Sequence, residues 1–197
     1  MPFGYCTLRI ALACRNVSGT HGKVPPSPIT IKAPHDARRA PAMKFSHLVE
    51  INDPLNPLIE PLTRAQLWRG LVLRAEQPKM FVPHLDSCDI LEKSAALVER
   101  ELRYGETVIR DRVSYLPQMQ VHYHVPEQKD IPMSDLTMTI EEPQEGVLYV
   151  RFIYDDHKAD EDSAQAFYNE FRRSAYQEAD IDTIRMVREL AENGALG

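Results

Sequence analysis

The longest helical pattern in the sequence covers residues 160–194, and it limits the folds open to this chain. Apart from Gly194, the segment contains neither glycine nor proline. Its apolar residues recur in steps of three and four, as on one face of an amphipathic helix. A helix of about 30 residues is roughly 45 Å long, so we expect it to lie along a second layer of structure. The apolar positions are Ala164, Phe167, Phe171, Ala175, Ile181, Ile184, Val187 and Ala191.

The apolar stripe of this segment changes direction near its middle. Its spacing drifts between Ala175 and Ile181. Asp180 lies at the start of the second half, and aspartate is a common N-cap residue. We therefore predict a kink, or a break into two helices, near residues 177–180.

Two runs of alternating residues predict a β-hairpin in the middle of the chain. Residues 96–104 and 107–115 each place apolar side chains mainly on one face, which is the period of a strand. Gly105 and Glu106 separate the two runs, and glycine at the first central position suits a two-residue type II′ turn. A turn of this length fixes the register of the two strands.

That register places one pair of opposite charges on the apolar face of the hairpin. If Tyr104 pairs with Thr107, Arg100 lies opposite Asp111. A buried pair of this kind is costly to desolvate, and the planar fork of arginine suits a ligand carboxylate, phenol or carbonyl. The pair is therefore our first candidate for a ligand anchor. The alternatives are a purely structural pair, or an arginine at the rim of the sheet with its head in solvent.

Five more segments alternate as strands do, which makes seven antiparallel strands joined mostly by short links. After the first strand, Thr63 and Gln66 form a capping-box pattern for a helix that ends before Pro78, and residues 80–82 could add a second short helix. We therefore predict an α+β helix-grip fold: a curved seven-stranded antiparallel sheet around a long C-terminal helix, with two short helices after strand one. The five segments are residues 45–51, 89–92, 119–125, 136–140 and 147–154.

The distribution of charge and cysteine bears on partners and location. The chain has a net charge of −6, although residues 1–42 contain six Lys and Arg and a single acid. The acidic remainder argues against nucleic acid as a partner. No run of about 18 apolar residues occurs, so we predict no membrane span. Three scattered cysteines, Cys6, Cys14 and Cys88, favour a reducing compartment, which we take to be the cytoplasm.

Residues 1–42 differ from the rest of the chain. They contain six prolines and three glycines and show no sustained periodicity. We expect a disordered extension, or a stretch that precedes the true translation start at Met43. The composition also faintly resembles an organellar transit peptide. The folded domain is predicted for residues 43–197.

Several motifs between residues 43 and 194 resemble the family of the acetylaranotin biosynthesis cluster protein L, a domain of unknown function in the SRPBCC, or START-like, superfamily. The predicted order of elements, which is a strand, a helix pair, six strands and a long C-terminal helix, also resembles the order found in this superfamily. The motifs are Leu62-Thr63-Arg64-Ala65-Gln66-Leu67-Trp68-Arg69-Gly70-Leu71, Pro78, Phe81-Val82-Pro83, Glu141-Glu142-Pro143, Phe152-Ile153-Tyr154 and the tail from Ala175-Tyr176 to Arg188-Glu189-Leu190.

This resemblance implies a cavity between the sheet and the C-terminal helix, and hence a binding protein for a small apolar or aromatic molecule, with a role in secondary metabolism. One alternative is an aromatase/cyclase-like or dehydratase-like enzyme that uses the same cavity. Another is an interaction protein that, like the chaperone activators of the superfamily, uses the outer face of the sheet. The family supplies no catalytic residues that could be carried over, so whether the chain is an enzyme stays open, and no cofactor is predicted.

Other candidate residues of the cavity share the predicted inner surface. The hydroxyls of Tyr115 and Tyr123 could meet a ligand, although a buried tyrosine is more often core with one hydrogen bond. His47 could act as an acid or base near neutral pH, or could be a satisfied core residue. Phe167 and Phe171 lie on the helical stripe that would close the cavity, where core packing is the alternative.

The remaining reactive side chains give weaker signals. His122 and His124 share a face, but no third ligand follows at close spacing, so a solvent-exposed face is favoured and no metal is predicted. Cys88 has no recognisable histidine partner and is expected to be buried. The enzyme alternative would depend on His47, Asp111 and Tyr115 as acid and base.

Overall fold

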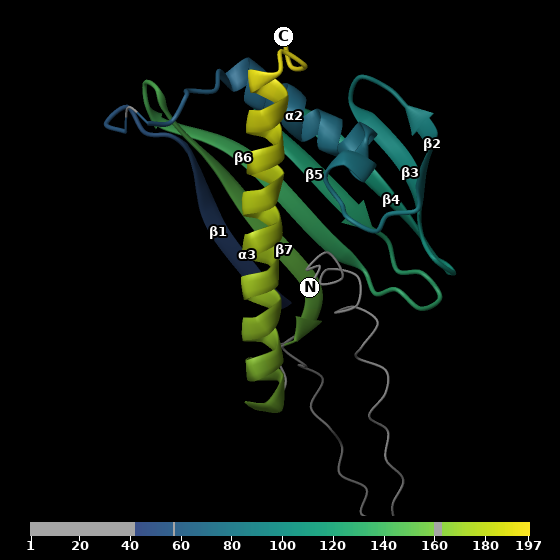
Figure 1. The fold of residues 1–197 in the computed structure, drawn as a ribbon. Coiled ribbons are helices and arrows are strands. Elements are labelled where there is room, and N and C mark those ends of the chain that lie inside the picture. The colour runs from purple at the N-terminus through teal and green to yellow at the C-terminus, as the bar shows by residue number, and fades with distance from the viewer. Residues whose placement is uncertain (1–41, 57, 160–162) are drawn as a thin grey trace, which may run out of the picture.

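The computed structural model describes residues 42–56, 58–159 and 163–197 of the chain. Its main feature is one seven-stranded antiparallel sheet with the strand order β1-β7-β6-β5-β4-β3-β2. Figure 1 shows the helices α2 and α3 on the same face of this sheet, with α3 crossing in front of β1 and β7. A short 3₁₀-helix, η3 (Pro78–Met80), follows α2. The arrangement confirms the predicted helix-grip fold.

The strands form a meander in which neighbours along the chain are neighbours in the sheet. The exception is β1, which pairs with the last strand, β7. Within β3, β4 and β5, buried residues come at every second position, so the alternation in the sequence separates the face under the helices from the outer face. The strands are β1 (Ala42–Asn52), β2 (Ser87–Lys93), β3 (Leu97–Tyr104), β4 (Thr107–Leu116), β5 (Gln120–Val125), β6 (Ser134–Gln144) and β7 (Val147–Ala159).

The turn between β3 and β4 has the predicted geometry. Gly105 has a φ of 59°, as the first central residue of a type II′ turn requires. Tyr104 pairs with Thr107, and Arg100 pairs with Asp111. The register read from the turn is therefore confirmed along the whole hairpin.

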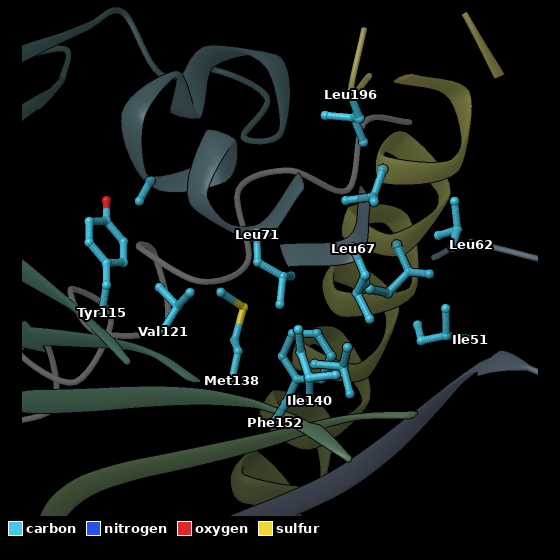
Figure 2. Close-up of a cluster of buried hydrophobic side chains, with 14 of the residues drawn as sticks. Ile51, Leu62, Leu67, Leu71, Tyr115, Val121, Met138, Ile140, Phe152 and Leu196 are labelled. Carbon is cyan, nitrogen blue, oxygen red and sulfur yellow. The ribbon is translucent and has the colours of Figure 1, made fainter. Parts of the chain in front are cut away.

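The helix α2 (Arg64–Glu76) begins at the predicted capping box. The backbone N–H of Gln66 donates to Thr63 Oγ1 at 3.1 Å, and the backbone N–H of Thr63 donates to Gln66 Oε1 at 2.9 Å. Leu67 and Leu71 are fully buried on the side that faces the sheet. Figure 2 shows them pointing toward Met138, Ile140 and Phe152, which belong to the central core.

The helix α3 (Ser163–Glu192) is continuous through residues 177–180 and runs straight in Figure 1, so the predicted kink or break is wrong. Asp180 is fully buried, and its carboxylate binds side chains of the sheet. It therefore does not cap a new helix. The predicted stripe is also partly wrong, because Phe171 is 56 % exposed and Ile181 is 42 % exposed.

Among the α3 residues whose side chains the structure describes, the buried face carries polar groups as far as Thr183 and apolar side chains from Ile184 onward, which a purely apolar stripe does not capture. Its buried members are Asn169, Tyr176, Asp180, Thr183, Ile184, Val187 and Leu190.

None of the helices in the described ranges is long and apolar enough to cross a membrane. The predictions made for residues 1–41 lie outside the described residues.

Candidate functional site

Arg100 and Asp111 form a buried pair on the inner face of the sheet, as predicted. They are 3 % and 8 % exposed. Arg100 Nε donates to Asp111 Oδ1 at 2.8 Å, and Nη2 donates to Oδ2. Nη1 donates to the backbone oxygen of Ala75 at 2.6 Å. The guanidinium thus uses its fork within the protein and fastens the sheet to the last turn of α2.

Tyr123 lies between two guanidinium groups on the same face. The Cζ atoms of Arg74 and Arg100 are each 5.2 Å from the centre of its ring. The Tyr123 side chain is buried, and its hydroxyl has no hydrogen-bond partner. Burial of a polar atom without a partner is uncommon in proteins, so this hydroxyl is a candidate ligand contact.

A pocket of about 460 Å³ lies between α2 and the half of the sheet that carries β2, β3 and β4. Trp68 of α2 meets Tyr115 of β4 edge to face, with ring centres 6.2 Å apart. The Tyr115 hydroxyl is buried and has no partner. At the edge of the pocket, Lys93 Nζ and Glu76 Oε2 are 2.7 Å apart. The lining residues are Trp68, Val72, Glu76, Lys93, Ser94, Ala95, Tyr115 and Pro117.

His47 belongs to a second polar network, between β1, β7 and α3. Its Nε2 lies 2.7 Å from Asp180 Oδ2, and the Tyr154 hydroxyl donates to the same carboxylate at 2.8 Å. The His47 ring stacks between Phe45 and Phe152. Its Nδ1 is buried without a hydrogen-bond partner. An imidazole held by a carboxylate, with its second nitrogen free, is an arrangement suited to proton transfer.

Burial dominates the ionisation of these groups. It raises the pKa of Tyr115, with a smaller contribution from Tyr123. Burial also raises the pKa of Tyr154 well above its ordinary value, and Asp180 adds to the effect. The pKa of Asp180 is raised because burial outweighs its contacts with His47 and Tyr154. The two tyrosines therefore keep their protons, and Asp180 loses its proton less readily than an exposed carboxyl group does.

The structure does not bring all the predicted site residues together. Tyr115, Tyr123, Arg100 and Asp111 lie near one another on β3, β4 and β5, whereas His47 lies across the sheet on β1. The side chain of Phe167 lies outside the described part of the chain. The exposure of Phe171 (56 %) places it on the solvent side of α3, so it does not close a cavity over Arg100.

Sequence reasoning missed three residues of these sites, all of them polar partners: Arg74, Tyr154 and Asp180. Tyr154 could have been found, because it is an inward-facing residue of a predicted strand. Arg74 and Asp180 gave no signal, since a charged residue on a helix is ordinarily assigned to solvent. Cys88 is a free, partly buried thiol, and burial raises its pKa, which does not favour a nucleophile.

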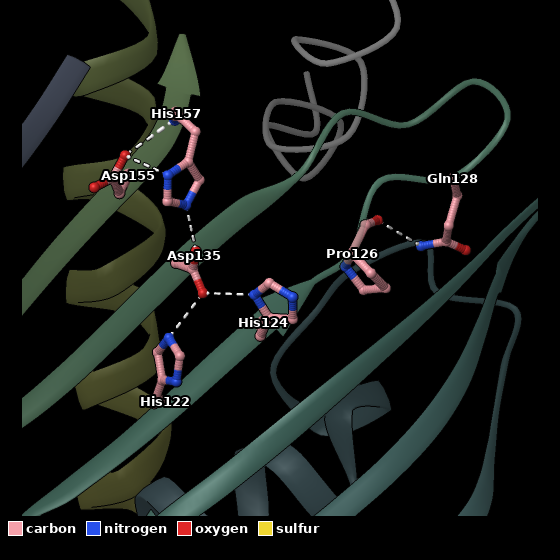
Figure 3. A network of polar contacts seen from close by, with 7 residues as sticks. All are labelled: His122, His124, Pro126, Gln128, Asp135, Asp155 and His157. Atoms are coloured by element: carbon pink, nitrogen blue, oxygen red, sulfur yellow. Dashed lines mark hydrogen bonds and ion pairs between the residues drawn. The ribbon is translucent and has the colours of Figure 1, made fainter. Parts of the chain in front are cut away.

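The outer face of the sheet carries a cluster around Asp135, shown in Figure 3. Its Oδ1 lies 2.8 Å from His122 Nε2 and 2.9 Å from His124 Nδ1, and its Oδ2 lies 2.5 Å from His157 Nε2. The imidazoles that the sequence placed on a solvent face thus have an acidic partner on the next strand. Within the described ranges, no group of three or more His, Cys, Asp or Glu is arranged to hold a metal ion.

The fold is similar to several solved structures of the helix-grip type, at identities that bear on the fold alone. The Zhui aromatase/cyclase from Streptomyces sp. R1128 is 12% identical with a TM-score of 0.50, over 76% of this chain and 93% of that one. The two-domain ARO/CYC StfQ of the steffimycin pathway is 12% identical with a TM-score of 0.55, over 77% and 52%. Human STARD10 is 13% identical with a TM-score of 0.51, over 79% and 67%.

These likenesses show that the chain has a START-like, helix-grip fold, and the inner face of its sheet carries the polar and aromatic groups described above. Its sequence places it more narrowly. Residues 49–194 match the model of the family described as acetylaranotin biosynthesis cluster protein L, and the chain belongs to that family. Among curated proteins, none matches the sequence.

Proposed function

We propose that the protein binds a small apolar or aromatic molecule in the pocket between α2 and the sheet. The observation that carries this proposal is the pocket of about 460 Å³ with Trp68 and Tyr115 in its wall. Ligand pockets are typically a few hundred Å³ in volume and mostly apolar, with few polar groups. The partnerless Tyr115 hydroxyl supplies one such group. A ligand oxygen or nitrogen that reaches it would satisfy it.

Arg100 has a different role in this proposal from the one expected from the sequence. Its donors are bound to Asp111 and to the Ala75 backbone oxygen. A ligand would have to displace these contacts to use the same donors. We therefore assign Arg100 the positioning of α2, which forms one wall of the pocket. The pocket also lies beside α2, whereas the sequence suggested a cavity beside the C-terminal helix.

Trp68 allows a direct test, because it is the only tryptophan of the chain. In isotope-labelled protein, its indole N–H gives a single side-chain signal that needs no assignment. Titration with the neutral aromatic probe naphthamide should shift this signal at the affinity measured by calorimetry. Val72→Phe, which fills the pocket, should weaken binding about tenfold or more in a folded protein. Leu91→Phe, at a residue 54 % exposed on β2, is the matched control and should change nothing.

Two outcomes would count against the pocket. One is an indole signal that stays in place while naphthamide binds. The other is a Val72→Phe variant that binds the probe as tightly as the natural protein. Native mass spectrometry of protein purified from its own host adds the identity of any molecule that remains bound.

A second candidate function is acid–base catalysis of ring closure and dehydration, and the His47, Asp180 and Tyr154 network favours it. The Asp180 carboxylate orients His47 through Nε2, which leaves Nδ1 as the proton acceptor. The pKa of Tyr154 is raised, first by burial, so its hydroxyl keeps its proton. Two solved structures similar in fold are described as aromatase/cyclases.

The catalytic candidate is tested with a linear diketone whose aldol closure and loss of water give a cyclic enone. A positioned acid or base typically contributes at least about a hundredfold in rate. His47→Asn and Tyr154→Phe should each lower the rate by about that factor while the fold is retained. Arg103→Met, which changes an exposed residue of β3, is the control and should keep the natural rate. If His47→Asn and Tyr154→Phe both react as fast as this control, or if the natural protein shows no turnover, binding remains the function.

A further inference from the structure

Arg74 lies on the opposite flank of α2 from the pocket. Val72 and Glu76, two residues to either side of it, line the pocket. Two residues correspond to about 200° of rotation around an α-helix. Arg74 accordingly faces α3, where its Nε donates to Thr183 Oγ1 at 3.3 Å. Its guanidinium therefore lies in the space between α2, α3 and the sheet.

Among the described residues, Arg100 has an acidic partner and Arg74 has none. Both guanidiniums lie against Tyr123 at 5.2 Å from the ring centre. Arg100 is paired with Asp111 through two hydrogen bonds. Among the described residues, Arg74 has no carboxylate within ion-pair distance, and its Nε donates to a hydroxyl, that of Thr183. A guanidinium does not lose its charge in a protein, so a partly buried cation without an acidic partner among the described residues lies here.

The groups around Arg74 are oriented toward a negative charge. The Tyr123 hydroxyl is buried and has no partner. Asp180 binds His47 and the Tyr154 hydroxyl instead of Arg74. Burial would lower the pKa of Arg74, but the nearby Tyr123, Tyr154 and Asp180 outweigh it and raise the pKa. The surroundings thus favour the charged form of Arg74.

We propose that Arg74 and Tyr123 form a binding site for the carboxylate of an organic acid. The two terminal nitrogens of Arg74 match the two oxygens of a carboxylate in a bidentate contact. The Tyr123 hydroxyl donates a third hydrogen bond to one of these oxygens. A monoanion suits the site better than a phosphate dianion. The dianion carries a second negative charge, and it is costly to remove that charge from water without a second cation to pair with it. An enolate or phenolate presents the same chemistry through one oxygen.

This site goes beyond the proposed function, because it lies on the other flank of α2 from the pocket and gives the chemical class of a ligand bound there. The test compares naphthoate with naphthamide by calorimetry on the full chain. The two probes share their rings and differ in the carboxylate. The natural protein should bind naphthoate about tenfold or more tightly than naphthamide, which is the range of charge-assisted hydrogen bonds. Arg74→Met should abolish this preference and leave the affinity for naphthamide unchanged.

The control is Arg103→Met, which removes one positive charge from an exposed position of β3 and should keep the preference. If Arg74→Met does not fold, Tyr123→Phe keeps the ring and removes only the hydroxyl, and it should reduce the preference several-fold. Equal affinities for both probes in the natural protein would overturn the proposal. So would a preference that survives in Arg74→Met, or in Tyr123→Phe where that variant takes its place.

The two proposals fail separately in these experiments. Loss of naphthamide binding in Val72→Phe depends on the pocket beside Trp68 and is independent of Arg74. Selective loss of the naphthoate preference in Arg74→Met depends on the other flank of α2. A protein that binds naphthamide in the pocket but shows no preference for naphthoate would overturn only the carboxylate site. A protein whose naphthoate preference depends on Arg74, but in which Val72→Phe changes nothing, would overturn only the pocket.

Discussion

Gly70 of α2 lies so close to Val187 of α3 that no side chain fits between the two helices. A Cβ at position 70 would come within 2.5 and 2.7 Å of the two Cγ atoms of Val187. Val187 is fully buried and β-branched, so its rotamer is restricted. Gly70→Ala should therefore destabilise the protein by about 1–3 kcal/mol, even though alanine favours a helix by up to about 1 kcal/mol over glycine. Urea denaturation measures the difference.

Val187→Ala provides the background that checks the cause. It costs stability through the cavity it creates, but it also removes the two Cγ atoms that a Cβ at Gly70 would meet and leaves only the Cβ of residue 187, at 3.1 Å. In that background Gly70→Ala should be close to neutral. If the two substitutions were simply additive, the close approach of the helices would not be the reason for the glycine.

Arg100 and Asp111 make a second prediction about stability. Removal of one member of a buried pair leaves an uncompensated charge and costs about 3–5 kcal/mol. Arg100→Met and Asp111→Leu should therefore each destabilise the protein strongly. The double variant, which leaves no buried charge, should recover much of the loss in urea denaturation. A double variant as unstable as the sum of both single ones would mean that the contact with the Ala75 backbone oxygen dominates instead.

The hydroxyls of Tyr115 and Tyr123 have no hydrogen-bond partner, whereas that of Tyr154 has one. Removal of a hydroxyl should therefore affect stability differently at these positions. Tyr115→Phe removes a buried hydroxyl that has no partner, so the free protein should be unchanged or more stable, by up to about 1 kcal/mol. Tyr154→Phe removes the donor to Asp180, and should destabilise by about 1–3 kcal/mol. Thermal unfolding of ligand-free protein measures both. A similar loss in both variants would mean that Tyr115 does have a partner within the fold.

The elements with short-range rules were predictable from the sequence. Gly105 fixes the turn, and the turn fixes every pair of the hairpin, so the contact between Arg100 and Asp111 followed from local spacing. The start of α2 followed in the same way from Thr63 and Gln66. These features depend on residues a few positions apart. No tertiary contact is needed to define them.

The polar groups of the interior depend on contacts between distant segments, and the sequence did not show them. Asp180 suggested a helix cap because its partner, His47, is 133 residues away in the chain. Arg74 resembled a surface residue of α2, since nothing in its own segment indicates Thr183 or Tyr123. His157 has a φ of 52° and follows the strand that the alternation predicted, so its approach to Asp135 required the three-dimensional path of β7.

The cluster around Asp135 predicts a dependence of stability on pH. Burial would raise the pKa of Asp135, but hydrogen bonds from His157, His124 and His122 outweigh it and hold the pKa below its ordinary value. A carboxyl whose pKa is lower in the folded state stabilises the fold above its unfolded pKa of about 3.9. This contribution is lost as the pH falls through the folded pKa.

Asp135→Asn should therefore lower the free energy of unfolding near neutral pH by about 1 kcal/mol, and the difference from the natural protein should shrink between about pH 5 and pH 3. Thermal unfolding across that range measures both effects. Glu106→Gln, in the exposed turn between β3 and β4, removes a carboxylate outside the cluster and should leave the pH profile nearly unchanged. A difference between Asp135→Asn and the natural protein that stays constant with pH would show that the carboxylate charge does not hold the three histidines.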